Sequence, residues 1–240
     1  MTLFPVLSTC TLYRMARRTG PTLSRRTVVE AALALADAEG LAAVTIRRLA
    51  TQLGVTPMAL YWHYRSKDEL LDGMAASILA DLDPTLDDDA TWQEQLRRLL
   101  GSLLDAFRAR PSTAALVPTR TIWTDEGLGT TEAALHILGR AGFSPTEATQ
   151  IARHAVSTVA NLVAAEPGVV VREESRDVAD DRRRARLFLE SLPPDRYPRL
   201  VEAAGPLTEG VDADAYFAFG LELLLAGIET IAARQGGDDG

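Results

Sequence analysis

Hydrophobic and polar positions repeat at helical spacing along almost the whole chain. Apolar residues recur three and four positions apart, which places their side chains on one face of an α-helix. The stretch 92–110 is a clear case, because Leu96, Leu99, Leu103 and Phe107 share one face of it. No stretch alternates apolar and polar residues as a half-buried strand would. We therefore predict an all-α fold.

Capping residues and helix breakers set the ends of the predicted helices. Thr91 can cap one long helix, and Ser144 with Pro145 can open another. Two prolines, Pro111 and Pro118, bound a short helical turn. The predicted helices, after one that begins near residue 25, cover 45–53, 57–63, 68–82, 92–110, 126–140, 146–166 and 213–233.

The first quarter of the chain contains the pattern of two short helices joined by a tight turn. Thr45 can cap a helix that ends at Leu53, where Gly54 permits a left-handed turn. Thr56 can cap a second helix with Pro57 at its first position, where a missing N–H costs little. Such a helix can enter the major groove of DNA, because its exposed N-terminal half presents side chains to base edges.

Charge is distributed unevenly along the chain. The whole sequence has a formal net charge of −8, which would ordinarily speak against a nucleic-acid partner. Residues 1–67, however, hold nine Lys and Arg against three Asp and Glu, so this end carries +6. The remainder holds sixteen against thirty and carries −14. A basic end on an acidic body is typical of a protein that docks on DNA by one face.

The segment 25–72 resembles the DNA-binding domain of the TetR (tetracycline repressor) family. The resemblance rests on TIRRLA at 45–50, LGV at 53–55, LYWHY at 60–64 and a capping-box pattern, SKDE, at 66–69. It implies an N-terminal three-helix bundle with a helix-turn-helix that binds double-stranded operator DNA. The residues that motif and resemblance place at the DNA are Thr45, Arg47, Thr56, Pro57, Ala59, Tyr61, Trp62, His63 and Lys67.

The resemblance also assigns roles to some of these residues. Arg47 and Ala59 correspond to positions that touch base edges, whereas Tyr61, His63 and Lys67 correspond to positions that mainly hold phosphates. Trp62 stays open between base contact, phosphate contact and packing.

Residues 1–24 are predicted to form a flexible basic arm ahead of the first helix. Arg17 and Arg18 lie on this arm. Arms of this kind can lie in the minor groove, where narrow A·T tracts concentrate negative potential. A tail with incidental charge is the alternative interpretation.

The last predicted helix carries a second resemblance, to C-terminal domains of the tetracycline-repressor type. The residues that carry it are FAFGLELLLAGIE at 217–229, together with WQ at 92–93 and GFS at 142–144. The resemblance implies that 73–235 is a larger helical domain for effector binding and dimerisation. Residues 236–240 are expected to be a disordered tail.

The apolar surface of the last helix also suggests a partner. Phe217 and Leu225 would face its own core, whereas Gly220, Leu223 and Gly227 would leave a smooth second face for another helix. In the family, the helices equivalent to 146–166 and 213–233 form a four-helix bundle with the same pair from a second subunit. We therefore expect a homodimer, whose symmetry suits a palindromic operator.

The second domain is expected to hold a small-molecule pocket. Tetracycline-binding members of the family use polar residues and a magnesium ion. This chain has Asp81, Leu99, Leu103 and Val117 where those members have histidine, asparagine, phenylalanine and histidine. We expect an apolar pocket with no metal or other cofactor, although Leu99 and Leu103 would suit a filled core equally well. The predicted pocket residues are Leu99, Leu103, Trp123, Thr131, Leu138, Arg153 and Ser157.

Other classes of protein find little support. The three histidines lack metal-ligand spacing, and the single Cys10 excludes a disulfide framework. We find no Gly-rich phosphate loop, G-x-S-x-G elbow or paired catalytic carboxylates, so we do not expect an enzyme. No apolar run approaches the roughly 20 residues that span a bilayer, and positive charge follows the apolar N-terminal stretch rather than preceding it. We therefore expect a cytoplasmic protein without a membrane partner.

These observations together favour a homodimeric, ligand-responsive transcriptional repressor. One alternative is an activator or global regulator that binds DNA but no small molecule, which a filled C-terminal core would favour. The other is a helical enzyme with a basic end, which lack of retention on DNA at moderate salt would favour.

Overall fold

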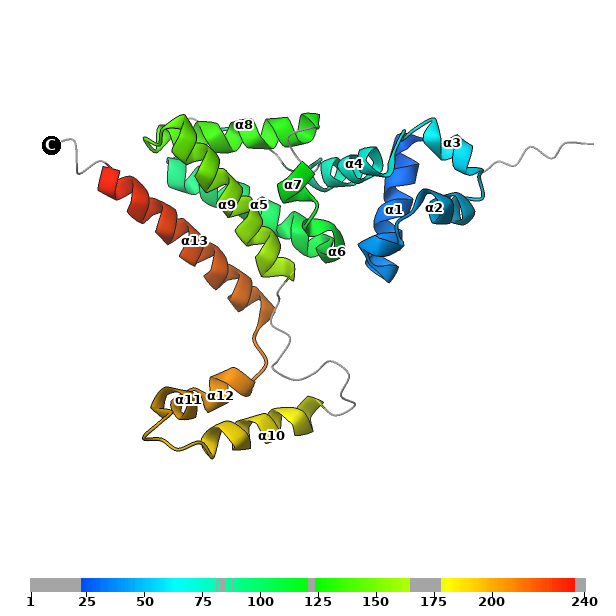
Figure 1. The fold of residues 1–240 in the computed structure, drawn as a ribbon. Coiled ribbons are helices and arrows are strands. Elements are labelled where there is room, and N and C mark those ends of the chain that lie inside the picture. The colour runs from blue at the N-terminus through cyan, green and yellow to red at the C-terminus, as the bar shows by residue number, and fades with distance from the viewer. Residues whose placement is uncertain are drawn as a thin grey trace, which may run out of the picture.

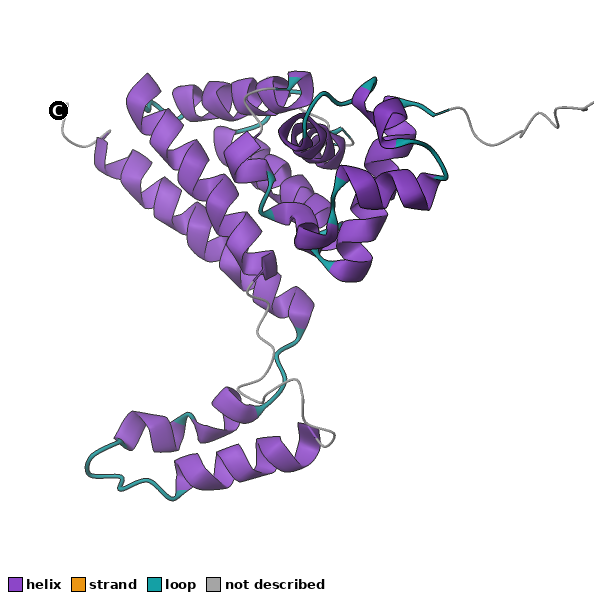
Figure 2. Ribbon diagram, turned by 45° about the vertical axis from the view of Figure 1, so that its right-hand side comes forward, coloured by secondary structure: helices purple, strands orange, loops and turns teal. Residues whose placement is uncertain are grey.

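The computed structural model describes residues 23–80, 82, 85–87, 89–120, 124–164 and 178–235. Over these residues the regular structure is entirely helical, as Figure 2 shows. The predicted all-α fold is therefore confirmed. The N-terminal domain lies at one end of the molecule, and the larger bundle lies beside it (Figure 1).

The N-terminal domain is a small bundle in which α1 packs against α2 and α4. A side-chain hydroxyl caps each of its helices, because Ser24, Thr45, Thr56 and Ser66 accept hydrogen bonds from first-turn backbone N–H groups. The elements are α1 (Arg25–Glu39), the 3-10 turn η1 (Leu41–Ala43), α2 (Ile46–Leu53), α3 (Pro57–Tyr61) and α4 (Lys67–Leu79).

The larger bundle is built around α5, which packs against α8, α9 and α13. A complete capping box opens α5: Glu94 N–H donates to Thr91 Oγ1 at 3.3 Å, and Thr91 N–H donates to Glu94 Oε2 at 2.9 Å. The elements are α5 (Trp92–Ala109), α6 (Pro111–Ala114), α7 (Val117–Arg120), α8 (Asp125–Arg140), α9 (Pro145–Ala164) and α13 (Ala213–Gln235).

Three further helices form a separate unit between α9 and α13. They are α10 (Val178–Glu190), α11 (Pro198–Glu202) and α12 (Ala204–Thr208), and they pack on one another. Figures 1 and 2 both show this unit projecting away from the body.

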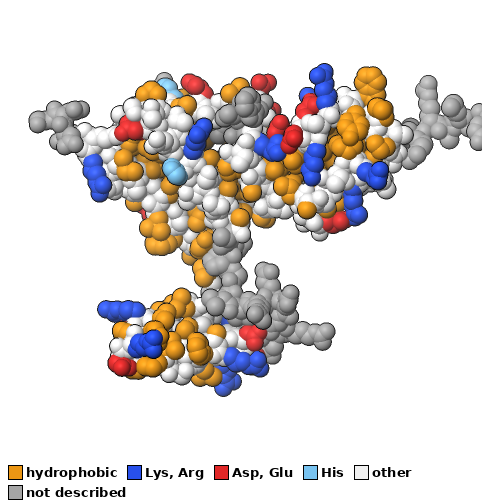
Figure 3. Space-filling view, viewed as in Figure 1, with side chains coloured by type: hydrophobic (Ala, Val, Ile, Leu, Met, Phe, Trp, Pro, Cys, Tyr) orange, Lys and Arg blue, Asp and Glu red, His pale blue; other side chains and the backbone are white. Residues whose placement is uncertain are grey.

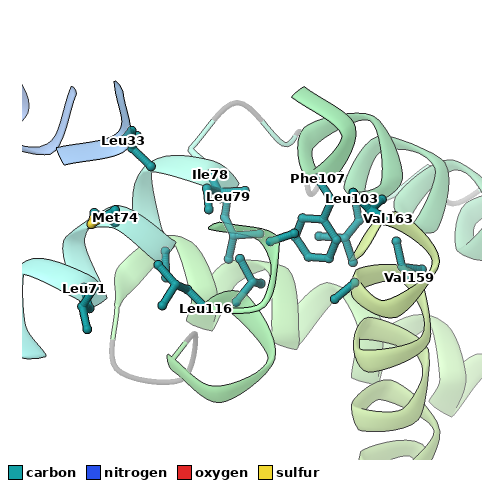
Figure 4. Packing of buried hydrophobic residues seen from close by; sticks show 14 of the residues in the cluster. Leu33, Leu71, Met74, Ile78, Leu79, Leu103, Phe107, Leu116, Val159 and Val163 are labelled. Carbon is teal, nitrogen blue, oxygen red and sulfur yellow. The ribbon is translucent and has the colours of Figure 1, made fainter. Parts of the chain in front are cut away.

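A continuous apolar core joins the two domains through α4. Met74 is fully buried on this helix, and Ile78 and Leu79 follow it one turn later, at the edge of the larger bundle. Figure 4 shows Leu79 close to Leu103 and Phe107, which belong to α5. Since close-packed interiors transmit strain, α4 connects the core of the bundle mechanically to the N-terminal domain.

Several helix ends differ from the sequence prediction by one to three residues, most clearly those of α3 and α4. α4 covers Lys67–Leu79 rather than 68–82, and α3 ends at Tyr61, so Trp62 and His63 lie in the turn that follows. α3 ends early because His63 N–H donates to the Leu60 carbonyl three residues back, which tightens the last turn of this helix.

The predicted capping box at 66–69 is only half formed. Glu69 N–H donates to Ser66 Oγ at 3.1 Å, as a capping box requires. The Glu69 carboxylate, however, accepts from Arg65 N–H at 2.7 Å instead of from Ser66 N–H. It also forms an ion pair with Arg25, so a tertiary contact redirects this side chain.

The final helix is unusually apolar, and it departs from the prediction at one glycine. In the described part of the chain, α13 alone is long and apolar enough, by length and composition, to cross a membrane. Glu222 and Glu229 interrupt its apolar run. Only 17% of its apolar window is buried within one chain. In addition, a Cβ at Gly220 would lie 2.6 Å from Leu162 Cδ2 of α9. This glycine therefore allows a close approach within the chain and does not belong to the outer face.

Candidate DNA interface and effector pocket

Buried apolar side chains hold α2 and α3 in a helix-turn-helix arrangement. Leu49 and Ala50 of α2 and Leu60 of α3 are all buried. Between the helices Gly54 adopts a left-handed conformation with φ of 66°, which glycine reaches without steric cost. Thr56 then caps α3, and Pro57 occupies its first position.

The outer surface of this motif consists of the residues that the sequence places at the DNA. Ala59 and His63 are half-buried, and Arg17 and Arg18 lie outside the described residues. The exposed members of the predicted set are Thr45, Arg47, Thr56, Pro57, Tyr61, Trp62 and Lys67.

Two residues that sequence reasoning missed position the end of α3. Arg25 donates through Nε to the His63 carbonyl at 3.0 Å, and its guanidinium lies over the Tyr64 ring at 4.8 Å. The Tyr64 hydroxyl donates back to the Arg25 carbonyl at 3.3 Å. Burial raises the pKa of this phenol, so it stays a neutral donor. Gly73 leaves space for it, since a Cβ there would lie 2.9 Å from the Tyr64 hydroxyl.

The two adjacent arginines of α2 differ in their surroundings. Arg48 forms an ion pair with Glu39 at 2.5 Å, which holds it against the end of α1. Arg47 is exposed and has no ion pair within the described part of the chain. It is therefore available to an external anion or base edge.

A cavity of about 460 Å³ lies among α5, α7, α8 and α9. Six of the seven predicted pocket residues line it, and the seventh, Trp123, lies outside the described residues. The six are Leu99, Leu103, Thr131, Leu138, Arg153 and Ser157.

The lining of this cavity is mainly apolar. Thr119, Thr130 and Thr149 add hydroxyl groups that sequence reasoning missed. Of these, Thr130 lies on α8 beside the predicted Thr131, so helical spacing could have indicated it. Among the described lining residues there is no carboxylate, imidazole or thiol. Since Mg²⁺ prefers carboxylate oxygens, this set of donors does not fit a magnesium ion.

One short helix connects the cavity to the N-terminal domain. Val117, Pro118 and Thr119 of α7 line the cavity, and the next residue, Arg120, reaches α4. Its guanidinium donates to Asp72 Oδ1 at 2.8 Å and to Asp68 Oδ1 at 3.0 Å. The hydrogen bond to Asp72 is the main reason why the pKa of Arg120 lies above its ordinary value.

A second and larger cleft, of about 1260 Å³, lies between α1 and α4 on one side and α5 and α8 on the other. Charged groups such as Arg25, Glu30, Asp105 and Arg110 line it. The cleft lies outside the predicted pocket, and its charged walls offer an apolar ligand little surface to bury.

Comparison with known proteins identifies relatives of both domains. Residues 83–232 match the family described as tetracyclin repressor-like, C-terminal domain. Residues 28–74 match the family described as bacterial regulatory proteins, tetR family. Together these two matches cover the helix-turn-helix and every lining residue of the cavity except Leu79.

Individual relatives are similar over most of their length. The tetracycline repressor protein class C of Escherichia coli is 31% identical, over 86% of this chain and 91% of its own. The HTH-type transcriptional repressor DrrR1 of Streptomyces coeruleorubidus is 29% identical, over 94% of this chain and 84% of its own. The crystal structure of the Streptomyces coelicolor TetR family protein ActR in complex with actinorhodin matches with a TM-score of 0.72 and 29% identity. That match covers 88% of this chain and 98% of ActR.

Proposed function

Because the chain belongs to the TetR family of transcriptional repressors, we propose that it binds a palindromic operator as a homodimer and releases it when a small, largely hydrophobic effector fills the cavity. The relatives are regulators, and we propose no enzymatic activity. We propose a cytoplasmic location, where the operator is found.

The observation that carries this proposal is the cavity of about 460 Å³ inside the C-terminal domain. A regulator without an effector would be expected to fill this space with core side chains, because empty apolar volume destabilises a protein. The volume falls in the range of small-molecule sites, and Arg120 connects its wall to α4. The cavity therefore favours a ligand-responsive repressor over an activator or global regulator without one.

The chemistry of the lining suggests the class of effector. Leu99, Leu103 and Leu138 offer apolar surface, whereas Arg153 and a few hydroxyls can orient polar groups. We propose an aromatic or polyketide-like molecule that carries a few polar groups and binds without a metal. The similarity to ActR, which was crystallised with actinorhodin, supports this class.

Release of operator DNA tests the proposed function. A panel of aromatic and polyketide-like compounds is titrated against the protein bound to an operator duplex, with and without a chelator. At least one compound should release the duplex, and the chelator should change nothing. A requirement for magnesium would contradict the metal-free pocket, and retention of the duplex throughout the panel would contradict the proposed effector class.

Filling the cavity should block this response. Ala134 lines the cavity, so Ala134→Phe should occupy part of its volume and weaken induction about tenfold or more, while operator binding stays near wild type. Glu132→Phe adds the same ring on the exposed face of α8 and serves as the matched control. Leu103→Arg should abolish induction if the protein folds, because it places a charge among apolar neighbours. Normal induction of both cavity variants would show that the effector binds elsewhere.

We propose that the dimer forms through α9 and α13. The outer face of α13 exposes Phe219, Leu223 and Ile231, with the small residues Ala226 and Gly227 between them. Figure 3 shows hydrophobic side chains along the outer edge of this helix. A second copy of the same face would cover this apolar surface and bring two helix-turn-helix units together on one duplex.

We propose base reading by Arg47 and phosphate contact by Lys67. Arg47→Ala should lose roughly 1–3 kcal/mol on the operator and relax specificity at one base pair. Lys67→Ala should weaken all duplexes alike and lower the salt slope by about one. Binding titrations on operator and random duplexes at several salt concentrations measure both effects.

Arg48→Ala is the control for Arg47, because Arg48 is already paired with Glu39. It should change operator specificity little. Equal losses on operator and random DNA for Arg47→Ala would contradict its proposed base contact. We also propose that Arg17 and Arg18 of the N-terminal arm contact the minor groove. Removal of residues 1–14 should then leave operator affinity unchanged, whereas removal of residues 1–22 should lower it. Equal affinity of the two truncated proteins would contradict this contact.

A further inference from the structure

Three large apolar or aromatic side chains stand exposed on α3 and in the turn that follows it. Met58 is 67% exposed, Tyr61 is 44% exposed and Trp62 is 86% exposed. Met58 and Trp62 are four positions apart, so they leave the chain on the same side. Figure 3 shows hydrophobic side chains gathered over this part of the molecule. Trp62 is thus too exposed to be a packing residue of the domain core.

The surroundings of this apolar surface are basic. Arg47, Arg65 and Lys67 are exposed on the elements next to it. An apolar protein partner would leave these cations without counter-charges, whereas a DNA backbone would supply phosphates to them. The surface therefore fits a partner that is anionic at its edges and apolar at its centre.

In the major groove of DNA, an apolar group lies between anionic backbones only where the base is thymine. The groove presents hydrogen-bond donors and acceptors at every base pair, and the 5-methyl group of thymine is its apolar group. Met58 occupies the second position of α3, in the half of a recognition helix that approaches base edges. Its thioether chain has no hydrogen-bond donor and adapts its shape to an apolar partner.

We propose that Met58 and Trp62 together read thymine methyl groups, so that each operator half-site places a thymine under each of these two side chains. This inference rests on the proposed DNA-binding function and adds the chemistry of the base that is recognised. Met58, which was not among the predicted DNA-binding residues, becomes a specificity-determining residue. Tyr61, for which the resemblance implies a phosphate contact, is not assigned a methyl group.

Replacing thymine by deoxyuridine tests this proposal, because the change removes the methyl group and keeps every hydrogen-bonding group. An operator duplex is first selected from a random pool by the purified full-length protein. Each thymine is then replaced in turn. At two positions per half-site, affinity should fall about fourfold for each replacement, the equivalent of about 0.8 kcal/mol for one buried methyl. Replacement in both half-sites should lower it about fifteenfold.

The matching protein variants assign each methyl group to a side chain. With Met58→Ala, deoxyuridine at one of the sensitive positions should cost nothing further, while the other position stays sensitive. With Trp62→Ala the pattern should be reversed. Leu128→Ala removes an exposed leucine of α8 and should leave the wild-type pattern unchanged.

Two results would overturn the proposal. Uniform tolerance of deoxyuridine by a protein that does select an operator would show that no methyl group is read, while leaving the DNA-binding function in place. Unchanged sensitivity in Met58→Ala and Trp62→Ala would show that other side chains read the methyl groups. Failure to select any operator would overturn the DNA-binding function itself, and the inference with it.

Discussion

Replacing Leu223 by arginine should convert the protein to a monomer and lower its affinity for a palindromic operator by about a hundredfold or more. Leu223 is 60% exposed in the single chain and lies on the outer face of α13, between Phe219 and Gly227. In a four-helix interface the new guanidinium would lose its water without gaining a partner, which is costly for a buried charge. A monomer holds only one recognition helix at a time, so it loses the gain from binding two half-sites at once.

Light scattering gives the oligomeric state, and titrations on whole and half operators give the affinities. The whole operator should lose far more affinity than the half operator, since each domain keeps its own contacts. Leu128→Arg is the matched control, because Leu128 is 53% exposed on α8 and lies outside the proposed interface. A Leu223→Arg protein that remains dimeric and binds the whole operator normally would contradict an interface through α13.

Local signals in the sequence were sufficient for most of the fold. Helix starts at Thr45, Thr56 and Thr91 follow from hydroxyls that cap the next turn, and such contacts involve residues only three apart. Helical spacing likewise placed Leu99 and Leu103 on the side of α5 that lines the cavity. Both kinds of signal act within a few residues, so a single sequence is enough to show them.

Two of the errors occur where a distant residue decides the outcome. Glu69 leaves its capping box because Arg25, more than forty positions away, attracts its carboxylate. Gly220 faces Leu162 of the same chain, a contact that depends on how α9 and α13 cross. The exposure of Met58 and Trp62 likewise depends on how α3 sits on its neighbours, so the sequence could not distinguish packing from contact with DNA.

Arg120→Gln should largely uncouple the effector from the operator. A saturating effector lowers the operator affinity of the wild type by some factor, and in this variant that factor should be about tenfold smaller. A difference of this size lies within the range of typical coupling energies. The reason is that α7 touches the cavity through Val117, Pro118 and Thr119, while Arg120 holds Asp68 and Asp72 on α4. An effector that displaces α7 can then act on α4, and so on the helix-turn-helix, only through packing. Operator binding without effector should stay within a fewfold of wild type.

The same variant should bind the effector almost normally in the absence of DNA, because Arg120 does not line the cavity. Calorimetric titration of effector into free protein, together with operator titrations at zero and saturating effector, separates binding from coupling. Arg97→Gln is the control, since Arg97 joins α5 to Glu222 of α13 by an ion pair of 2.8 Å that lies away from α7.

Exchanging the charges of Arg120 and Asp72 tests whether their ion pair couples the cavity to α4 or whether Arg120 only supports the fold. The double variant Arg120→Asp with Asp72→Arg keeps opposite charges on α7 and α4, so it should recover much of the response. Arg120→Asp alone sets three carboxylates together and should respond least. A ligand releases the operator only through its different affinity for two states, and this ion pair is a direct polar link between α7, at the cavity wall, and α4. If Arg120→Gln released the operator as readily as wild type, the coupling would run instead through the packed contacts of Leu79 with the cavity.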